Sequence, residues 1–209
     1  MLTVLFGEQF DTFRHILEFY LPEGARILDV TYGHGKLWQT VGKAARFRYE
    51  VVTNDIDPES PAQFHVPITE LPSVFPWHSF DAIIYDPPYK YDKPSYILYQ
   101  RSDQDWTPIK TKWSIELQKK CAFDLNNIAP VLLKREGFLI VKIMDTRYKG
   151  ELVLNHKLII DSLTRFELID LLVYIRTLVG LFKNEKHAQT AHGYFLVFKV
   201  KGHHPLTSY

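Results

Sequence analysis

Asp86, Pro87, Pro88 and Tyr89 form the segment whose residue types say most about chemistry. They follow the apolar run Ala82–Tyr85, so we expect them at the carboxyl end of a strand. A carboxylate can accept a hydrogen bond from an amino group, and proline fixes φ, so that nearby carbonyls become positioned acceptors. The tyrosine ring offers a face for stacking. The segment could therefore hold a flat ring that carries an exocyclic amine, although Asp-Pro-Pro is also a common strand-to-turn signal.

A second motif lies upstream, where a strand predicted over 26–30 leads into Thr31-Tyr32-Gly33-His34-Gly35. A helix is predicted from Leu37 onward. A glycine turn between a strand and a helix lets the backbone approach a ligand, because glycine tolerates positive φ and has no Cβ. A lone G-x-G is weak evidence for a dinucleotide, and an ordinary tight turn is the alternative.

The next predicted strand, over 49–54, ends in Asp55-Ile56-Asp57. An acidic residue at this tip is placed to accept hydrogen bonds from ribose hydroxyls, and Ile56 could pack on an adenine ring. The alternative is a solvated turn in which an aspartate caps the following helix. The three motifs together, in this order and spacing, favour a cofactor that contains a nucleoside.

At this point the chain resembles the S-adenosylmethionine-dependent methyltransferases. The resemblance is carried by D-x-x-x-G-x-G, the acidic tip and D-P-P-Y, and it is closest to the DNA amino-methyltransferases of adenine N6 or cytosine N4. Segments 141–145 with Gly150, 186–188 and 192–199 resemble the fifth strand and the closing segment of small phage-type members. The likeness extends over about 23–199 by eye.

The resemblance implies three sets of site residues. The catalytic residues would be Asp86, Pro87, Pro88 and Tyr89. The residues that bind S-adenosylmethionine would be Asp29, Thr31, Tyr32, Gly33, Gly35, Asp55, Ile56 and Asp86. Substrate contacts would come from Lys90, Tyr91, Lys186 and His187. No metal is expected, because a sulfonium methyl is already a strong electrophile.

Two departures from the family pattern concern the cofactor. The usual Asp-Pro-Phe before the glycines is Asp29-Val30-Thr31 here, which removes a phenylalanine. The aspartate that commonly ends the third strand and reaches the cofactor's adenine amine is replaced by Pro67. The adenine contact must then come from elsewhere, such as the backbone or Thr69.

The length of 209 residues and a hydrophobic content of 46% predict one domain, over 1–209, with a large core. A net charge of +1 argues against a globally basic coat, so any nucleic-acid binding must depend on a local patch. The single cysteine, Cys121, excludes a disulfide framework and is compatible with a cytoplasmic protein. The longest apolar region, 166–182, contains three charged residues, so we expect no membrane span.

Alternating strands and helices predict a Rossmann-like α/β fold with a doubly wound, mainly parallel, seven-stranded sheet. Segment 1–24 is expected to be an N-terminal helical segment, with a helix over 8–20. The final strand is expected to run antiparallel. The seven strands are predicted over 26–30, 49–55, 64–68, 81–85, 138–144, 167–175 and 192–201, and further helices over 36–45, 113–133 and 157–164.

Residues 90–113 are predicted to form a long substrate loop that combines aromatic and basic side chains, a composition that suits nucleic acid. A loop that tucks its aromatics into the core is the alternative. The chain leaves little room for a target-recognition domain. Either the loops read the substrate, or a homodimer or a separate recognition subunit supplies this function.

The leading interpretation is a methyltransferase for N6 of adenine in DNA. The second is an RNA base methyltransferase, for example one acting on guanine N2, because such enzymes also carry D-P-P-Y. The third is a catalytically silent protein of this fold that binds nucleic acid for a partner enzyme.

Overall fold

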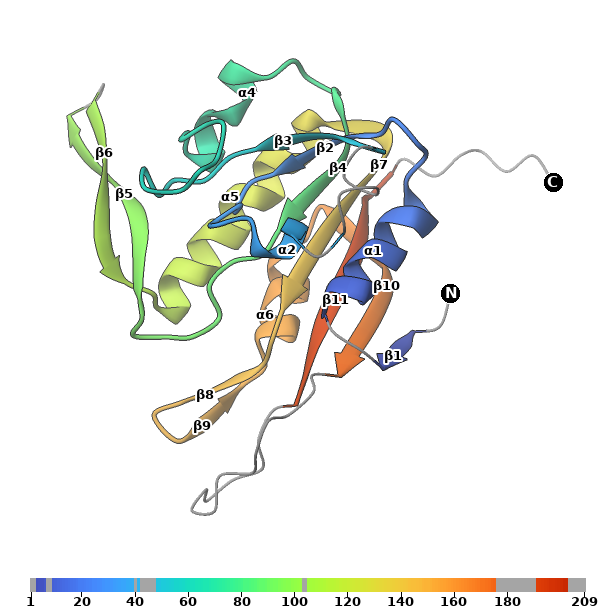
Figure 1. The fold of residues 1–209 in the computed structure, drawn as a ribbon. Helices are drawn as coiled ribbons and strands as arrows, with labels where there is room; N and C mark the ends of the chain where they lie inside the picture. The colour runs from blue at the N-terminus through green and yellow to red at the C-terminus, as the bar shows by residue number, and fades with distance from the viewer. Residues whose placement is uncertain are drawn as a thin grey trace.

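A seven-stranded sheet forms the centre of the computed structural model, which describes residues 3–6, 9–39, 41, 48–102, 105–175 and 191–202 (Figure 1). The strand order is β1-β10-β11-β7-β4-β2-β3. Only β11 runs antiparallel to its neighbours among the described strands of this sheet. The predicted fold class, including the antiparallel C-terminal strand, is confirmed.

The strands of the sheet are β1 (Val4–Phe6), β2 (Arg26–Asp29), β3 (Glu50–Thr53), β4 (Phe80–Tyr85), β7 (Leu133–Ile143), β10 (Phe166–Ile175) and β11 (His192–Val200). The helices are α1 (Gln9–Tyr20), α2 (Lys36–Gln39), a 3-10 turn η1 (Ile68–Glu70), α4 (Leu71–Val74), α5 (Ile115–Leu132) and α6 (Asn155–Ser162). The predicted helix over 36–45 lies partly outside the described residues.

Two predictions about the strands are wrong, although the count of seven agrees. The expected third strand over 64–68 is reduced to a single bridge between Asn54 and Phe64. Asn54 replaces further ladder bonds with side-chain bonds, because its amide donates to the Val66 carbonyl and accepts from the Val66 N–H, both at 2.9 Å. The seventh strand is instead β1, in the segment expected to be helical, and it pairs parallel with β10.

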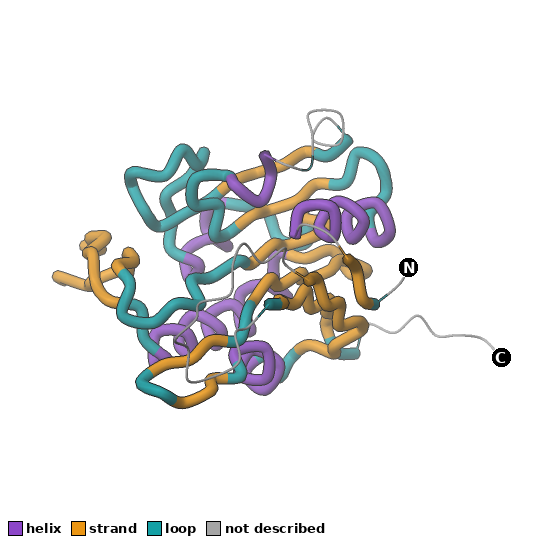
Figure 2. Tube along the Cα trace, turned by 60° about the horizontal axis from the view of Figure 1, so that its bottom comes forward, coloured by secondary structure: helices purple, strands orange, loops and turns teal. Residues whose placement is uncertain are grey.

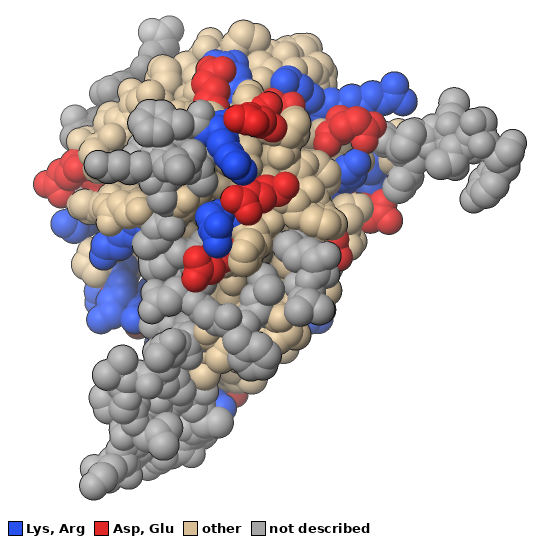
Figure 3. Space-filling model, turned by 45° about the vertical axis from the view of Figure 1, so that its right-hand side comes forward, with Lys and Arg blue, Asp and Glu red and all other residues tan. Residues whose placement is uncertain are grey.

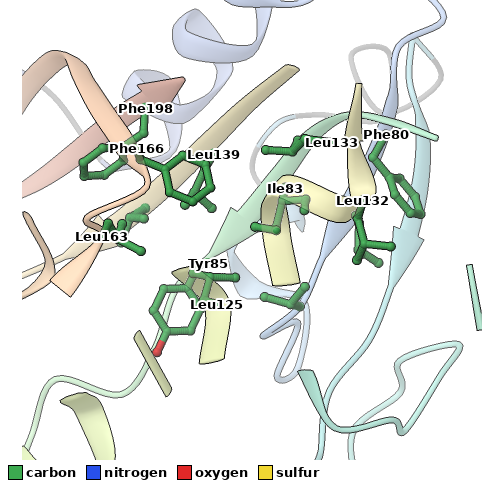
Figure 4. Packing of buried hydrophobic residues seen from close by; sticks show 14 of the residues in the cluster. Phe80, Ile83, Tyr85, Leu125, Leu132, Leu133, Leu139, Leu163, Phe166 and Phe198 are labelled. Atoms are coloured by element: carbon green, nitrogen blue, oxygen red, sulfur yellow. The ribbon is translucent and has the colours of Figure 1, made fainter. Parts of the chain in front are cut away.

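Helices cover both faces of the sheet, and each face has its own hydrophobic core (Figure 2). The core under α5 and α6 includes Ile83, Leu125 and Ile159; Figure 4 shows Ile83 and Leu125 there. The core under α1 and α2 includes Phe13 and Trp38. Residues 82–85 of β4 and 139–141 of β7 are buried on both faces of the sheet, which explains why these parts of the sequence are continuous apolar runs rather than alternating patterns.

The predicted loop over 90–113 is instead a two-stranded antiparallel ribbon of β5 (Pro94–Ser102) and β6 (Asp105–Lys112). A second ribbon joins β8 (Thr146–Tyr148) to β9 (Glu151–Val153). Both project from the edge of the sheet at which the parallel strands end (Figure 1). After the first ribbon, the Ser114 hydroxyl accepts a hydrogen bond from the Leu117 N–H and caps α5.

Within the described part of the chain, no helix combines the length and apolarity needed to cross a membrane.

Candidate active site

A cavity of about 1280 Å³ opens at the carboxyl ends of β2, β3 and β4. Its wall combines the glycine turn, the tip of β3, the D-P-P-Y segment, the base of the β5–β6 ribbon and one side of α5. Lining residues from the predicted site are Thr31, Gly33, Asp55, Ile56, Asp86, Pro87, Pro88 and Tyr89. Three motifs that are far apart in sequence therefore meet at one cavity, as expected for parallel strands whose carboxyl ends share an edge.

The glycine turn depends on its two glycines for different reasons. Gly33 and Gly35 have φ of 55° and 70°, in the left-handed region that disfavours other residues. A Cβ at Gly35 would lie 2.5 Å from the Tyr32 hydroxyl oxygen, whereas a Cβ at Gly33 would meet nothing within 4 Å. Gly35 thus allows a close packing contact, and Gly33 leaves open space at the cavity wall.

Asp55 ties the glycine turn to the tip of β3. Its Oδ2 accepts a hydrogen bond from the Gly33 N–H at 2.7 Å, and its Oδ1 accepts from the Asp57 N–H at 2.8 Å. Burial raises the pKa of Asp55 above its ordinary value, although these two hydrogen bonds oppose the shift. Each carboxylate oxygen keeps a further acceptor position, so Asp55 can still bind a ligand hydroxyl.

Asp29 lies behind the wall and does not line the cavity. It is 1% exposed, and its carboxylate accepts hydrogen bonds from the Thr31 N–H at 2.9 Å and from Trp38 Nε1 at 2.6 Å. Burial raises the pKa of Asp29 to about 7, and the charges of Asp86 and Asp55 add to the shift. Asp29 therefore changes its charge close to neutral pH.

The D-P-P-Y segment is attached directly to the glycine motif. The Asp86 N–H donates to the Thr31 hydroxyl at 2.7 Å. Pro87 is buried, Pro88 is exposed at the rim, and Tyr89 packs against both hydrophobic cores. The Asp86 backbone is consequently fixed to the glycine motif, and this places the Asp86 side chain at the cavity wall.

Lys142 is a residue of this site that the motifs did not identify. It lies on β7, is 4% exposed, lines the cavity, and its Nζ is 2.8 and 2.9 Å from the two carboxylate oxygens of Asp86. Its ammonium also lies 5.6 Å from the centroid of the Tyr89 ring. The available signal was a single lysine within the apolar run of 138–143, which is costly unless the charge is paired.

Several predicted residues lie elsewhere. Tyr32 and Gly35 support the turn from behind the wall, and Lys90 is exposed beside it. Tyr91 is buried, and its hydroxyl lies 2.5 Å from Asn155 Oδ1 and 3.0 Å from Gln118 Oε1. Burial raises the pKa of Tyr91 to about 12. Residues 186 and 187 lie outside the described part of the chain.

The part of the wall nearest α5 bears on the missing adenine contact. Pro67 and Thr69 line the cavity, and so does Asp124 of α5, whose carboxylate accepts a hydrogen bond from Lys120 at 2.6 Å. The Tyr85 hydroxyl is buried beside them and has no hydrogen-bond partner among the described residues (Figure 4). Such a buried, unpaired group is uncommon and indicates a place where a ligand or water binds.

Charge is unevenly distributed around the cavity. Acidic side chains gather at the β3 tip, at Asp55, Asp57 and Glu59, while Lys110 and Lys120 come from the ribbon and α5. On the side where α1 lies, basic and acidic side chains alternate (Figure 3), and Arg14 and Arg48 both approach Glu18. Among the described residues, no group of three or more histidine, cysteine, aspartate or glutamate side chains could hold a metal ion.

Comparison with solved structures shows which proteins share this fold. TrmN from Thermus thermophilus is similar over 90% of this chain, with a TM-score of 0.56 and 16% identity. A SAM-dependent methyltransferase from Methanosarcina mazei is similar over 88% of this chain and 97% of its own length, with a TM-score of 0.54 and 16% identity. The chain has the fold of S-adenosylmethionine-dependent methyltransferases.

The chain spans about half of TrmN, 48% of its length. A 1,6-didemethyltoxoflavin-N1-methyltransferase from Burkholderia thailandensis, solved with bound 1,6-didemethyltoxoflavin and S-adenosylhomocysteine, is similar with a TM-score of 0.51 and 12% identity. The likeness covers 90% of this chain and 76% of that enzyme. No protein-family model matches the sequence, and no curated protein is similar to it. The likeness is therefore one of fold, and the reaction has to be argued from the site.

Proposed function

We propose that this chain is an S-adenosylmethionine-dependent methyltransferase that methylates an exocyclic amino nitrogen of a nucleobase, with N6 of adenine in DNA as the favoured acceptor. One observation carries the proposal. The Asp86 N–H is bonded to Thr31, so the carboxylate of D-P-P-Y and the glycine turn share one cavity wall. A site that receives a cofactor and an amine together needs this juxtaposition.

The cavity wall suits S-adenosylmethionine, which when bound supplies an electrophilic methyl group. Thr31, Gly33, Asp55 and Ile56 would hold it, with open space at Gly33 and a carboxylate at Asp55 for ribose hydroxyls. Asp29 would support the turn from behind. The buried, unpaired Tyr85 hydroxyl offers one more polar contact at the α5 end of the cavity.

The chain's own residues would then prepare the amine. An aromatic amine is a weak nucleophile because its lone pair is delocalised into the ring. Hydrogen bonds from its two N–H groups to the Asp86 carboxylate and the Pro87 carbonyl would favour a tetrahedral nitrogen and stabilise the positive charge that develops there. Tyr89 would stack on the ring and fix its orientation. The proton can leave after transfer, so Asp86 need not act as a base.

Nucleic acid is the favoured partner because Lys110 and Lys120 stand on one side of the cavity, where phosphates could bind. A base in a duplex would have to be flipped out to reach Asp86.

DNA is favoured by the resemblance of D-P-P-Y to the DNA amino-methyltransferases. RNA is the second candidate, because a structure from Clostridium thermocellum with a TM-score of 0.51 at 13% identity bears the name of an rRNA-methylase. That likeness covers 93% of this chain and 98% of that one. A cytoplasmic location, and a homodimer or separate recognition subunit, belong to the same proposal.

A methyl-transfer assay with labelled S-adenosylmethionine tests the proposal on DNA, RNA and free nucleosides, followed by mass analysis of the nucleosides. N6-methyladenine from DNA is the expected product. Asp86→Ala should abolish transfer and leave cofactor binding, measured by calorimetry, largely intact. Asp81→Ala is the matched control, because Asp81 lies at the other end of β4 and pairs with Lys134 as Asp86 pairs with Lys142.

Cofactor binding without transfer to any substrate would instead favour a silent nucleic-acid-binding protein. Equal loss of transfer and cofactor binding in Asp86→Ala would mean that Asp86 serves the cofactor or the fold.

A further inference from the structure

The ion pair between Lys142 and Asp86 is not needed to explain the fold. Lys142 is the one charged residue in the run 138–143, and its side chain is 5% exposed. A buried ion pair commonly contributes no more stability than apolar side chains of similar size. The register of Tyr85 against Val141 places Asp86 and Lys142 side by side on one face of the sheet, directly at the cavity.

Both residues of the pair line the cavity and still have unused hydrogen-bonding capacity. An ammonium has three N–H donors, and the two contacts to Asp86 account for two of them. Among the described residues Lys142 has no other hydrogen-bond partner, so one donor remains for a ligand. Each Asp86 oxygen likewise keeps an acceptor position. The pair thus presents a donor and an acceptor 2.8 Å apart beside the Tyr89 ring.

Electrostatics argues against a role for Lys142 in merely neutralising Asp86. Positive charge develops on the amine nitrogen during methyl transfer, and a cation beside the carboxylate weakens the stabilisation that the carboxylate gives. The benefit of the lysine must therefore come from something else that it contacts. In adenine and cytosine, the ring carbon that carries the amine is bonded to a ring nitrogen with a free lone pair, and this nitrogen accepts hydrogen bonds.

We propose that Lys142 is a specificity residue, an inference that rests on the proposed function. Lys142 donates a hydrogen bond to the ring nitrogen adjacent to the acceptor amine, while Asp86 accepts a hydrogen bond from the amine itself. The pair then reads an amine and a neighbouring ring nitrogen together, as found at N6 and N1 of adenine. Aliphatic amines and anilines lack that second atom and would be poor substrates. Tyr89 would keep the ring in the plane that brings both atoms to the pair.

Atom-specific base analogues test this role of Lys142. In 1-deazaadenine a C–H replaces N1 and the amine is kept, whereas in 3-deazaadenine a C–H replaces N3, a ring nitrogen remote from the amine. Wild-type protein should methylate an oligonucleotide carrying 1-deazaadenine with about 10- to 100-fold lower kcat/KM than one carrying adenine, as expected for one lost hydrogen bond to a charged group. Replacing adenine by 3-deazaadenine should lower kcat/KM much less. Loss of N1 makes the amine more electron-rich, so slower transfer cannot result from a weaker nucleophile.

Variants extend the comparison. Lys142→Met should methylate adenine poorly and no longer distinguish it from 1-deazaadenine, and Lys142→Arg should keep the distinction because it keeps a donor. Lys134→Met is the matched control, since Lys134 pairs with Asp81 at the opposite end of the same two strands and does not line the cavity. Affinity for each oligonucleotide without cofactor, measured by fluorescence anisotropy, gives a readout that is independent of turnover.

The outcomes separate the two proposals. If wild-type protein methylates adenine and 1-deazaadenine equally well, the role of Lys142 is overturned and the proposed function stands. Discrimination that persists in Lys142→Met overturns it as well. If nucleoside analysis names cytosine as the acceptor, 3-deazacytosine takes the place of 1-deazaadenine. Transfer to no base at all would overturn both proposals. If Lys142→Met does not fold, the wild-type comparison still decides.

Discussion

Asp29 should make the stability of the protein depend on pH in the opposite direction from an ordinary salt-bridged carboxylate. Its pKa is raised from 3.8 to about 7 because the group is buried. Between these two values the folded state holds a proton that the unfolded state has lost. The free energy of unfolding therefore falls as the pH rises through this window, and the loss is complete above about pH 7.

The size of the effect follows from the difference of about three pH units, which corresponds to about 4 kcal/mol. This is a large part of the roughly 5–15 kcal/mol that holds a typical domain together. Urea unfolding of the cofactor-free protein at pH 5, 6, 7 and 8 measures it. Asp29→Asn should remove this contribution, so the difference between wild type and variant should change by a few kcal/mol from pH 5 to pH 8.

The comparison has to rest on the pH dependence rather than on any single value. An asparagine oxygen can accept from Trp38 or from Thr31 but not from both as the carboxylate does, so the variant loses about 1 kcal/mol at every pH. Asp11→Asn, at an exposed carboxylate of α1, controls for the removal of one charge. Parallel stability curves for wild type and Asp29→Asn would refute the argument, because they would show that Asp29 does not titrate in this range.

Further predictions concern the same cavity. Binding of S-adenosylmethionine, which carries a net positive charge, should favour the ionised form of Asp29. Calorimetry should therefore show proton release on binding at pH 6 and tighter binding at pH 8 than at pH 6. Asp29→Asn should remove both the proton release and the pH dependence of the affinity. Gly33→Val should weaken cofactor binding at least tenfold, because a β-branched residue disfavours φ of 55° and its side chain fills open space at the wall. Gly24→Val is the control, because Gly24 also has a positive φ, of 80°, but precedes the opposite end of β2; this variant should leave cofactor binding unchanged. Tyr91→Phe should lower the free energy of unfolding by about 1 kcal/mol in urea titrations, because the Asn155 side-chain oxygen loses a buried donor.

Much of the fold could be predicted because its central strands leave a simple signal. Strands β2 and β4 are short, buried and end in turn residues, so their positions follow from composition alone. Strand β1 could not be predicted, because three residues have no distinctive pattern and pair only with β10, far along the chain. The 64–68 segment resembled a strand, yet the Asn54 side chain takes the place of a ladder partner there.

The β5–β6 ribbon was missed for a related reason. Its strands contain Pro94 and Pro108 and many polar residues, a composition that indicates a loop. Neither proline prevents a two-stranded ribbon, because each strand has an open edge on which an N–H is not required. The base of the ribbon lines the cavity, whereas the backbone conformation expected from composition was wrong.

Lys142 marks the boundary of what motifs can identify. D-P-P-Y and the glycine turn are each contiguous in sequence, so their residue types alone predict a shared chemistry. The partner of Asp86 lies on a strand that is separated from it by the β5–β6 ribbon and all of α5, and only the parallel pairing of β4 with β7 brings the two together. A buried lysine near the end of an apolar strand requires an anion close by, and the carboxylate at the end of the neighbouring strand is the group that topology places within reach. Lys142 can therefore be assigned to the site once the order of the strands in the sheet is known, and a motif search has no access to that order.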